Sequence, residues 1–219
     1  FCPWQGSRVE VRKGIIKPDG TIVTASSLSD KYEGTNTTIA AKDGTLTSTD
    51  VTKTGFYIKK FMTPNKVVDY EKGETNWMVF RYAEVLLNYA EACVELGDNA
   101  EALRAVNLIR ERAGIAPRTS INRDQVRHER KVELAFENHR WWDIRRWHIA
   151  DQLLNAKQFK ALNPYLVWED GKDVSQMKYI FKVEDAPKNT RTFLPKLYYG
   201  RIPSDAISTN PNIIQNPGY

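Results

Sequence analysis

The chain has 219 residues, of which 41% are hydrophobic and 27% are charged, and its formal net charge is +5. This composition is typical of a folded protein of one or two domains and excludes a disordered or fibrous one. No apolar run reaches the eighteen or so residues of a membrane helix, and the small positive charge does not by itself indicate nucleic acid.

The start of the chain does not look like a translation start. It begins with Phe1 and lacks the basic, apolar and small-residue pattern of a signal peptide, so we expect further residues upstream. Cys2 lies in a predicted loop, whereas Cys93 falls on a helical apolar stripe and is expected to be buried. The sequence leaves open whether the two cysteines form a disulfide.

Residues 1–78 are expected to be loop-rich and partly β. Pro18 and Asp19 stand at the centre of a turn closed by Gly20, and apolar residues on both sides of it predict a small hairpin. Residues 26–54 are rich in Ser, Thr, Asp and Gly, which predicts an exposed excursion. This part of the chain is therefore a candidate ligand-facing layer.

Residues 79–219 are expected to form a mainly helical region. In 79–117 apolar residues recur at intervals of three and four, and Gly97 and Gly114 end the two predicted helices. The pair resembles one tetratricopeptide repeat, a helical hairpin that usually needs about three copies to bury its apolar stripes. Companion repeats or other packing are therefore expected.

The rest of this region is predicted to hold a charged helix pair, a hairpin and a tail. Asn122 followed by Gln125 is typical of a helix N-terminus, and we expect two helices within 122–153. Alternating apolar residues predict a β-hairpin over 163–184, and the proline-rich tail 185–219 is expected to be extended. The predicted fold class is mainly α, with a tetratricopeptide-like hairpin, further helices, loop-rich segments and small β-hairpins.

The stretch "HERKVELAFENHRWWDIRRW", residues 128–147, could belong to three kinds of site. Its interleaved positive and negative charges disfavour a nucleic-acid surface, and its histidine spacing does not fit a zinc site. Glu129 and Glu133 are one helical turn apart and could form an acid–base pair, but neighbouring arginines would keep both carboxyls ionised. We expect no enzyme activity, no metal and no cofactor.

A structural network is the interpretation that we favour for this stretch. Acidic residues would pair with arginines, and tryptophans would shield the pairs from water. The residues concerned are Glu129, Arg130, Glu133, Arg140, Trp141, Trp142, Asp143, Arg146 and Trp147. We expect Arg140→Ala to destabilise the protein without affecting a ligand site.

Four motifs resemble the C-terminal half of the SusD/RagB family of nutrient-binding outer-membrane lipoproteins. In order they are "FRYAEVLLNYAEACVELG", "LIRERAGI", "VRHERKVELAFENHRWWDIRRW" and the terminal "NPNIIQNPGY". The resemblance covers about Gly55 to Tyr219. It implies a SusD-like fold that binds an oligosaccharide, or in some relatives a peptide, at the cell surface.

The same resemblance implies partners. One would be a SusC-like TonB-dependent transporter, which the protein covers as a lid. The other would be the outer membrane, to which a lipid anchor upstream of this chain would attach the protein. No nucleic acid is expected. A tetratricopeptide-type module that binds protein and no sugar is the alternative from another class.

Aromatic side chains with polar neighbours are the candidate ligand residues, because sugars present apolar faces between hydroxyl groups. Trp4 is the candidate platform, with Gln5 and Arg8 as donors, although ordinary packing would explain Trp4 equally well. Tyr32 is a second candidate. Trp77 and Trp168 are expected to lie in the core.

Overall fold

The computed structural model describes most of the chain. The described residues are 11–41, 58, 60–61, 76–186 and 190–219. Within them, no helix is both long and apolar enough to cross a membrane.

Packing divides the chain into two compact units. Unit 1 comprises Phe1–Ile58 with Leu153–Phe193, and unit 2 comprises Lys59–Gln152 with Leu194–Tyr219. This division differs from the one expected between residues 78 and 79. The reason is that a hairpin from the second half of the chain pairs with the first strand of the N-terminal part.

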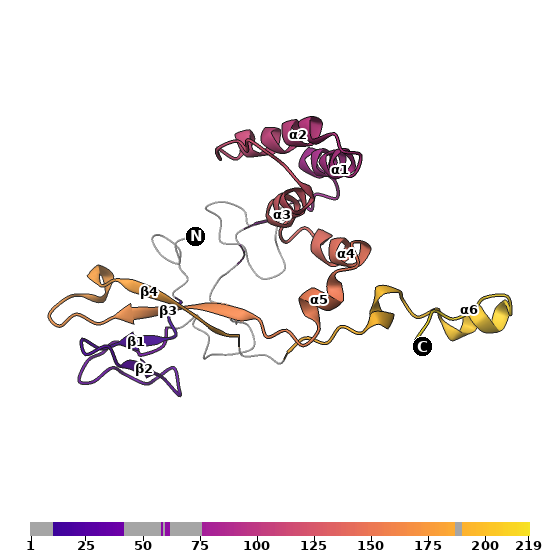
Figure 1. The fold of residues 1–219 in the computed structure, drawn as a ribbon. Coiled ribbons are helices and arrows are strands. Elements are labelled where there is room, and N and C mark those ends of the chain that lie inside the picture. Colours follow the sequence, from indigo (N-terminus) through magenta and orange to yellow (C-terminus); the bar gives the residue numbers. More distant parts are fainter. Residues whose placement is uncertain (1–10, 42–57, 59, 62–75, 187–189) are drawn as a thin grey trace. The chain divides into compact units, whose positions relative to one another are not determined.

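Unit 1 is built on a four-stranded sheet in the order β2-β1-β3-β4 (Figure 1). Strands β1 (Gly14–Ile16) and β2 (Ile22–Thr24) form one antiparallel hairpin, and β3 (Lys160–Val167) and β4 (Tyr179–Asp185) form the other. Both predicted hairpins are therefore confirmed. Their union through parallel pairing of β1 with β3 was not predicted, because sequence alternation does not identify a partner strand.

The two turns of this sheet follow from their sequences. The Gly20 N–H donates to the Lys17 carbonyl at 2.9 Å, and Gly20 has φ +87°, a value that glycine adopts without strain. The longer β3–β4 connection contains a short 3₁₀ helix, η1 (Val174–Gln176).

Residues 26–41 match the exposed excursion that their composition predicts only in part, because many are exposed but a few enter the core. Tyr32, Ile39 and Ala40 are buried in the core of unit 1. The buried guanidinium of Arg12 holds this loop in place, because its Nη2 donates to the Thr38 carbonyl at 2.8 Å and its Nε to the Ile39 carbonyl at 3.3 Å. The prediction was thus wrong for Tyr32, Ile39 and Ala40, and residues 42–54 lie outside the described part.

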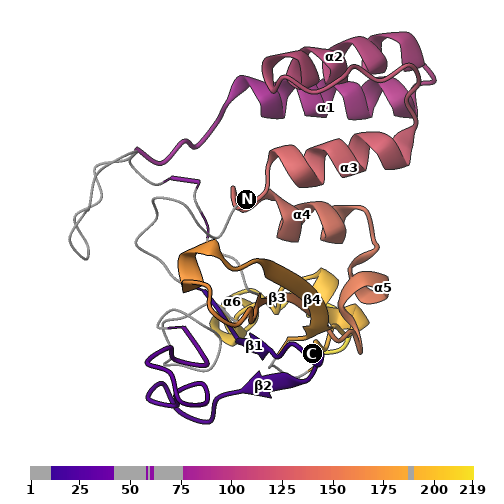
Figure 2. The ribbon, with the colours of Figure 1, turned by 90° about the vertical axis from the view of Figure 1, so that its left-hand side faces the viewer.

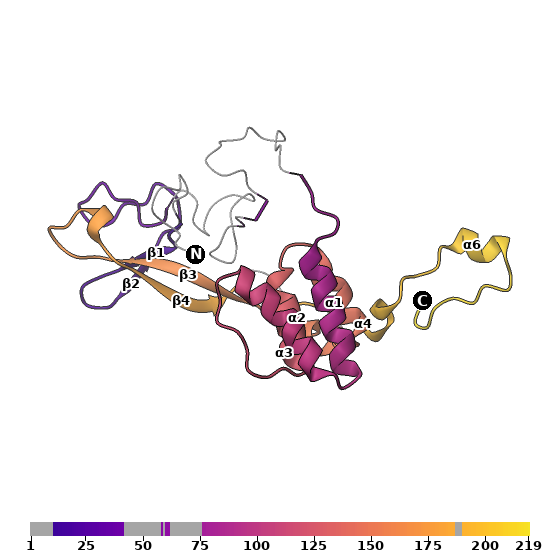
Figure 3. The same cartoon turned by 90° about the horizontal axis from the view of Figure 1, so that it is seen from above.

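Unit 2 contains the predicted helical hairpin, α1 (Tyr82–Glu95) and α2 (Asn99–Arg112), followed by α3 (Arg123–Glu133). Figure 2 and Figure 3 both show α1 and α2 side by side, with α3 packed next to them. Their shared core is apolar and includes the free thiol of Cys93. Asn122 caps α3 by accepting the Gln125 N–H at 2.9 Å, as predicted.

The second helix of the predicted charged pair is interrupted. Instead of one helix, the chain forms α4 (His139–Arg146) and α5 (Ala150–Leu154). His148 has φ +53°, and the Ile149 N–H bonds the Ile144 carbonyl at 3.0 Å, which closes α4 in a Schellman motif. No glycine marks this helix end, so no local pattern predicts it.

The tail also differs from the extended chain that was expected. It contains a 3₁₀ helix, η2 (Pro195–Tyr198), and a short helix, α6 (Ser204–Thr209). No residue of α6 is buried, so no apolar period marks it in the sequence. The mainly helical fold class is confirmed despite these differences.

Candidate functional site

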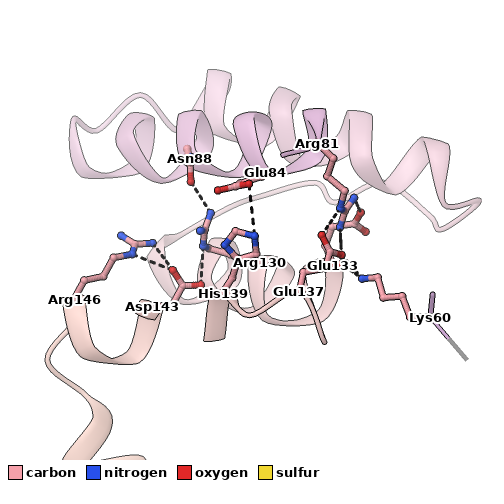
Figure 4. A network of polar contacts seen from close by, with 10 residues as sticks. All are labelled: Lys60, Arg81, Glu84, Asn88, Arg130, Glu133, Glu137, His139, Asp143 and Arg146. Atoms are coloured by element: carbon pink, nitrogen blue, oxygen red, sulfur yellow. Dashed lines mark hydrogen bonds and ion pairs between the residues drawn. The ribbon is translucent and has the colours of Figure 1, made fainter. Parts of the chain in front are cut away.

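The charged stretch contains a buried ion pair that joins three helices. Arg130 Nε donates to Asp143 Oδ2 at 2.7 Å, and Arg130 Nη1 donates to Asn88 Oδ1 at 2.6 Å (Figure 4). Arg146 Nε donates to the second oxygen of Asp143 at 3.0 Å. The side chains of Arg130 and Asp143 are only 5% and 3% exposed. Asn88, Arg130 and Asp143 thus hold α1, α3 and α4 together.

The two glutamates considered as an acid–base pair are occupied by arginines. Each carboxylate binds two guanidinium groups at 2.6–2.8 Å. Glu129 binds Arg110 and Arg118, whereas Glu133 binds Arg81 and Arg112. None of these four arginines lies within residues 128–147. Helical spacing shows which residues share a face, but it does not show which helix that face meets.

Three members of the expected network do not take the part in it that was expected. Arg140 forms no ion pair with any residue that the structure describes, and burial lowers the pKa of its guanidinium. Trp141 and Trp142 are 44% and 62% exposed, so they do not shield the Arg130–Asp143 pair. The expectation was wrong for these three residues.

Trp147 contacts charged groups as expected, but its acidic partner lies on α1. Its Nε1 donates to Glu91 Oε1 at 2.6 Å, and the Arg146 guanidinium lies 4.8 Å from the Trp147 ring centroid. Arg146 binds the same Glu91 carboxylate at 2.6 Å. Burial by itself would raise the pKa of Glu91. The hydrogen bonds from Arg146 and Trp147 have the larger combined effect, so the pKa of Glu91 is lowered.

A second cluster was missed in the sequence because its members are far apart along the chain. Glu137 accepts hydrogen bonds from Lys60 and from Arg81 Nε, the latter at 2.6 Å (Figure 4). Nearby, His139 Nε2 lies 3.6 Å from Glu84 Oε2. The carboxylates of this region are therefore engaged in structural contacts, and among the described residues no group of His, Cys, Asp and Glu is placed to hold a metal ion.

The predicted ligand residues fall in different places. Trp4, Gln5 and Arg8 lie outside the described residues. Tyr32 lies at a recess of about 440 Å³ in unit 1, which we call the Trp168 recess. Its lining residues are Lys17, Pro18, Asp19, Tyr32, Glu33, Thr35, Trp168 and Asp170.

Two aromatic rings form the apolar part of the Trp168 recess. The centroids of Tyr32 and Trp168 are 4.4 Å apart, and the ring planes are inclined by 45°. Tyr32 is only 6% exposed, so it offers an edge and a hydroxyl group, while the partly exposed indole of Trp168 offers a larger apolar surface. Burial raises the pKa of Tyr32, which keeps its phenol protonated and able to donate.

Polar groups surround these rings. Lys17 donates to Glu33, and this hydrogen bond raises the pKa of the lysine. The Thr21 N–H donates to Asp19 at 2.8 Å and lowers the pKa of that carboxyl. The Trp168 indole N–H donates to Asp170 at 2.9 Å. The recess thus combines an apolar ring surface with fixed ammonium and carboxylate groups, which is the chemistry that recognises a sugar ring and its hydroxyl groups.

The two tryptophans that were expected in the core differ from that expectation to different degrees. Trp77 is 55% exposed and stacks on Phe61 with ring centroids 4.8 Å apart, so the prediction was wrong for it. Trp168 packs partly against the core of unit 1 and also lines the recess. Trp168 lies in the predicted hairpin 163–184, just before its turn, so the sequence could have indicated a position at the end of a sheet.

Comparisons with known proteins agree on one family. The model described as the SusD family matches residues 1–219. A SusD-like protein of Bacteroides ovatus is 39% identical over 87 residues, which are 36% of this chain and 16% of that protein. SusD-like protein P2 of Formosa agariphila is 38% identical over 115 residues, which are 44% of this chain and 23% of that protein.

Solved structures give the same result. The crystal structure of a SusD-like protein from Bacteroides fragilis matches with a TM-score of 0.62 and 30% identity. The match covers 94% of this chain and 36% of that one. This chain therefore spans well under half the length of the relatives that it matches.

Proposed function

The chain belongs to the SusD family, and from this premise we propose that it is part of a cell-surface protein that binds glycans. Binding would take place without chemical change to the ligand. The observation that carries the proposal, beside family membership, is the Trp168 recess, where an indole surface lies among fixed polar groups. Trp4, Gln5 and Arg8 remain proposed contributors to ligand binding.

The ion pairs of unit 2 support binding over hydrolysis. A glycosidase needs a carboxyl group that faces its substrate and is free to donate a proton to it. Glu129 and Glu133 each bind two guanidinium groups, so both carboxylates are already engaged in ion pairs. The strongest acid–base candidate in the sequence therefore suits a structural role.

Affinity electrophoresis through gels that contain single polysaccharides tests the proposal. We expect one or more glycans to retard the protein and Trp168→Ala to abolish most of that retardation, because the substitution removes the ring surface. Trp77→Ala is the matched control, since Trp77 is an exposed tryptophan outside the recess. Retardation by no polysaccharide would contradict the proposal and would favour a peptide ligand or a protein-interaction module.

We further propose that the whole protein passes its ligand to a SusC-like TonB-dependent transporter and is held on the outer membrane by a lipid. These steps follow from family membership and not from the geometry of this chain. Co-purification of the full-length protein with a transporter barrel, and mass spectrometry of a lipid-modified cysteine upstream of Phe1, would test them separately.

A further inference from the structure

Unit 2 contains a second recess, which the proposed function does not use. It has a volume of about 330 Å³ and lies where α4 and the loop after it meet η2. We call it the Arg145 recess. Its lining residues are Trp142, Arg145, Arg146, His148, Tyr198 and Tyr199.

Aromatic rings make up most of its surface. His148 is exposed and stacks on Tyr198, with ring centroids 4.7 Å apart and planes inclined by 28°. Trp142 and Tyr199 are largely exposed. His148 is also the residue whose left-handed backbone ends α4. Such rings present flat surfaces of the kind that pack against sugar rings.

Arg145 supplies positive charge that no acidic group of the described residues neutralises through an ion pair. Its Nη2 donates to the Tyr198 carbonyl at 2.6 Å, and its guanidinium lies 5.3 and 5.5 Å from the ring centroids of Trp141 and Trp142. Its Nε is buried without a hydrogen-bond partner in the described part of the chain. Among the described residues its Nη1 makes no hydrogen bond, so that nitrogen can donate to an anion.

The second arginine of the recess is different. Arg146 binds Glu91 at 2.6 Å and Asp143 at 3.0 Å, so its charge is already balanced. Asp151 lies nearby and accepts the Tyr198 hydroxyl, which lowers the pKa of the Asp151 carboxyl. The attraction for an anion therefore comes from Arg145, and a ligand would need to place its negative group beside that side chain.

We propose that the Arg145 recess binds an acidic sugar residue, with its ring against Trp142 or Tyr199 and its anionic group on Arg145. The negative group would be the carboxylate of a uronic acid or a sulfate ester, since a guanidinium N–H group donates to either. This inference rests on the proposed function, because it assigns a ligand class to a glycan-binding protein. It adds a second site, separate from the Trp168 recess.

Isothermal titration tests the inference with soluble oligosaccharides prepared from three polymers: a neutral galactan, a polygalacturonan and a sulfated carrageenan. We expect at least one acidic probe to bind, and Arg145→Gln to weaken its binding by about 10- to 100-fold. Trp142→Ala, which leaves Arg145 in place, should also weaken the binding of that probe. The two acidic probes distinguish a carboxylate from a sulfate as the preferred group.

Matched variants control for charge and for aromatic exposure. Arg104→Gln removes an exposed guanidinium from α2, and Trp77→Ala removes an exposed indole, and neither should change the binding of an acidic probe. Because Arg145 also binds the Tyr198 carbonyl, melting temperatures are compared, and Trp142→Ala carries the test if Arg145→Gln unfolds.

The outcomes separate this inference from the proposed function. Binding of acidic probes that is lost in Trp168→Ala but unchanged in Trp142→Ala and Arg145→Gln would overturn the Arg145 recess and leave glycan binding intact. Failure of both acidic probes to bind overturns it as well. Loss of acidic binding only in the Arg145-recess variants supports it, even where a neutral glycan binds at the Trp168 recess.

Discussion

At the scale of single residues, the value of an ion pair in this protein depends on its burial. Arg130 and Asp143 are almost fully buried, and each has a further polar partner, Asn88 for Arg130 and Arg146 for Asp143. Arg123 and Glu95 form a bond of similar length, 2.5 Å, but at the surface. Removing one partner of a buried pair leaves a charge without solvent, whereas an exposed partner is simply hydrated.

We predict that Arg130→Ala lowers the free energy of unfolding by about 3–5 kcal/mol. The reason is that the buried Asp143 would lose one of the two ion-pair partners that it has among the described residues and would retain Arg146. Arg123→Ala, at the start of the same helix, should lower it by less than about 1 kcal/mol. Urea denaturation followed by circular dichroism measures both values, and equal losses would refute the argument from burial.

At the scale of elements, the sequence predicts what is local. The hairpin at Gly20, the α1–α2 hairpin and the Asn122 cap depend on neighbouring residues, and the structure contains all three. The end of α4 at His148 was missed because the left-handed residue there is not a glycine. Local signals therefore located most helices and strands but not every boundary.

The arrangement of the elements could not be predicted in the same way. The β1–β3 pairing joins residues about 150 positions apart, and the four arginines around Glu129 and Glu133 come from other segments. The candidate site shows the same limit. Tyr32 was identified as an aromatic near polar residues, but its partner Trp168 is known only once β3 is placed beside β1.

The cluster around Glu137 predicts how stability responds to acid. Burial by itself would raise the pKa of Glu137. The hydrogen bonds from Arg81 and Lys60 have the larger combined effect, so the pKa of Glu137 is lowered. A carboxyl with a lowered pKa stabilises the fold above its unfolded pKa of about 4.3, and this contribution is lost as pH falls through the folded value. We therefore predict that Glu137→Gln has a lower melting temperature than the parent at pH 7 and that the gap narrows toward pH 3.

The control for this measurement is Glu111→Gln. Glu111 is exposed on α2 and forms no ion pair with any residue that the structure describes. Its substitution should change the melting temperature little at any pH. If the difference in melting temperature between Glu137→Gln and the parent stayed constant between pH 7 and pH 3, ionisation of the Glu137 carboxyl would not contribute to the stability of the fold.

At the scale of the whole molecule, the two units have separate cores. The core of unit 1 is formed by β1, β3 and the loop around Tyr32, and the core of unit 2 by α1, α2 and α3. The two clusters of buried residues share no member. Substitutions far apart without shared partners usually act independently, so a defect in one core should remain largely within its unit.

Hydrogen exchange tests this independence with one substitution in each unit. An added Cβ at Gly14 would lie 2.3 Å from the Val23 carbonyl oxygen, so Gly14→Ala must shift the β1–β2 hairpin, at a cost of about 1–3 kcal/mol. We predict that it accelerates exchange in peptides from residues 160–185 and leaves 82–112 unchanged, and that Arg130→Ala does the reverse. Gly200→Ala is the control, because no atom lies within 4 Å of its added Cβ. If either substitution accelerated exchange equally in both sets of peptides, the units would unfold as one cooperative body.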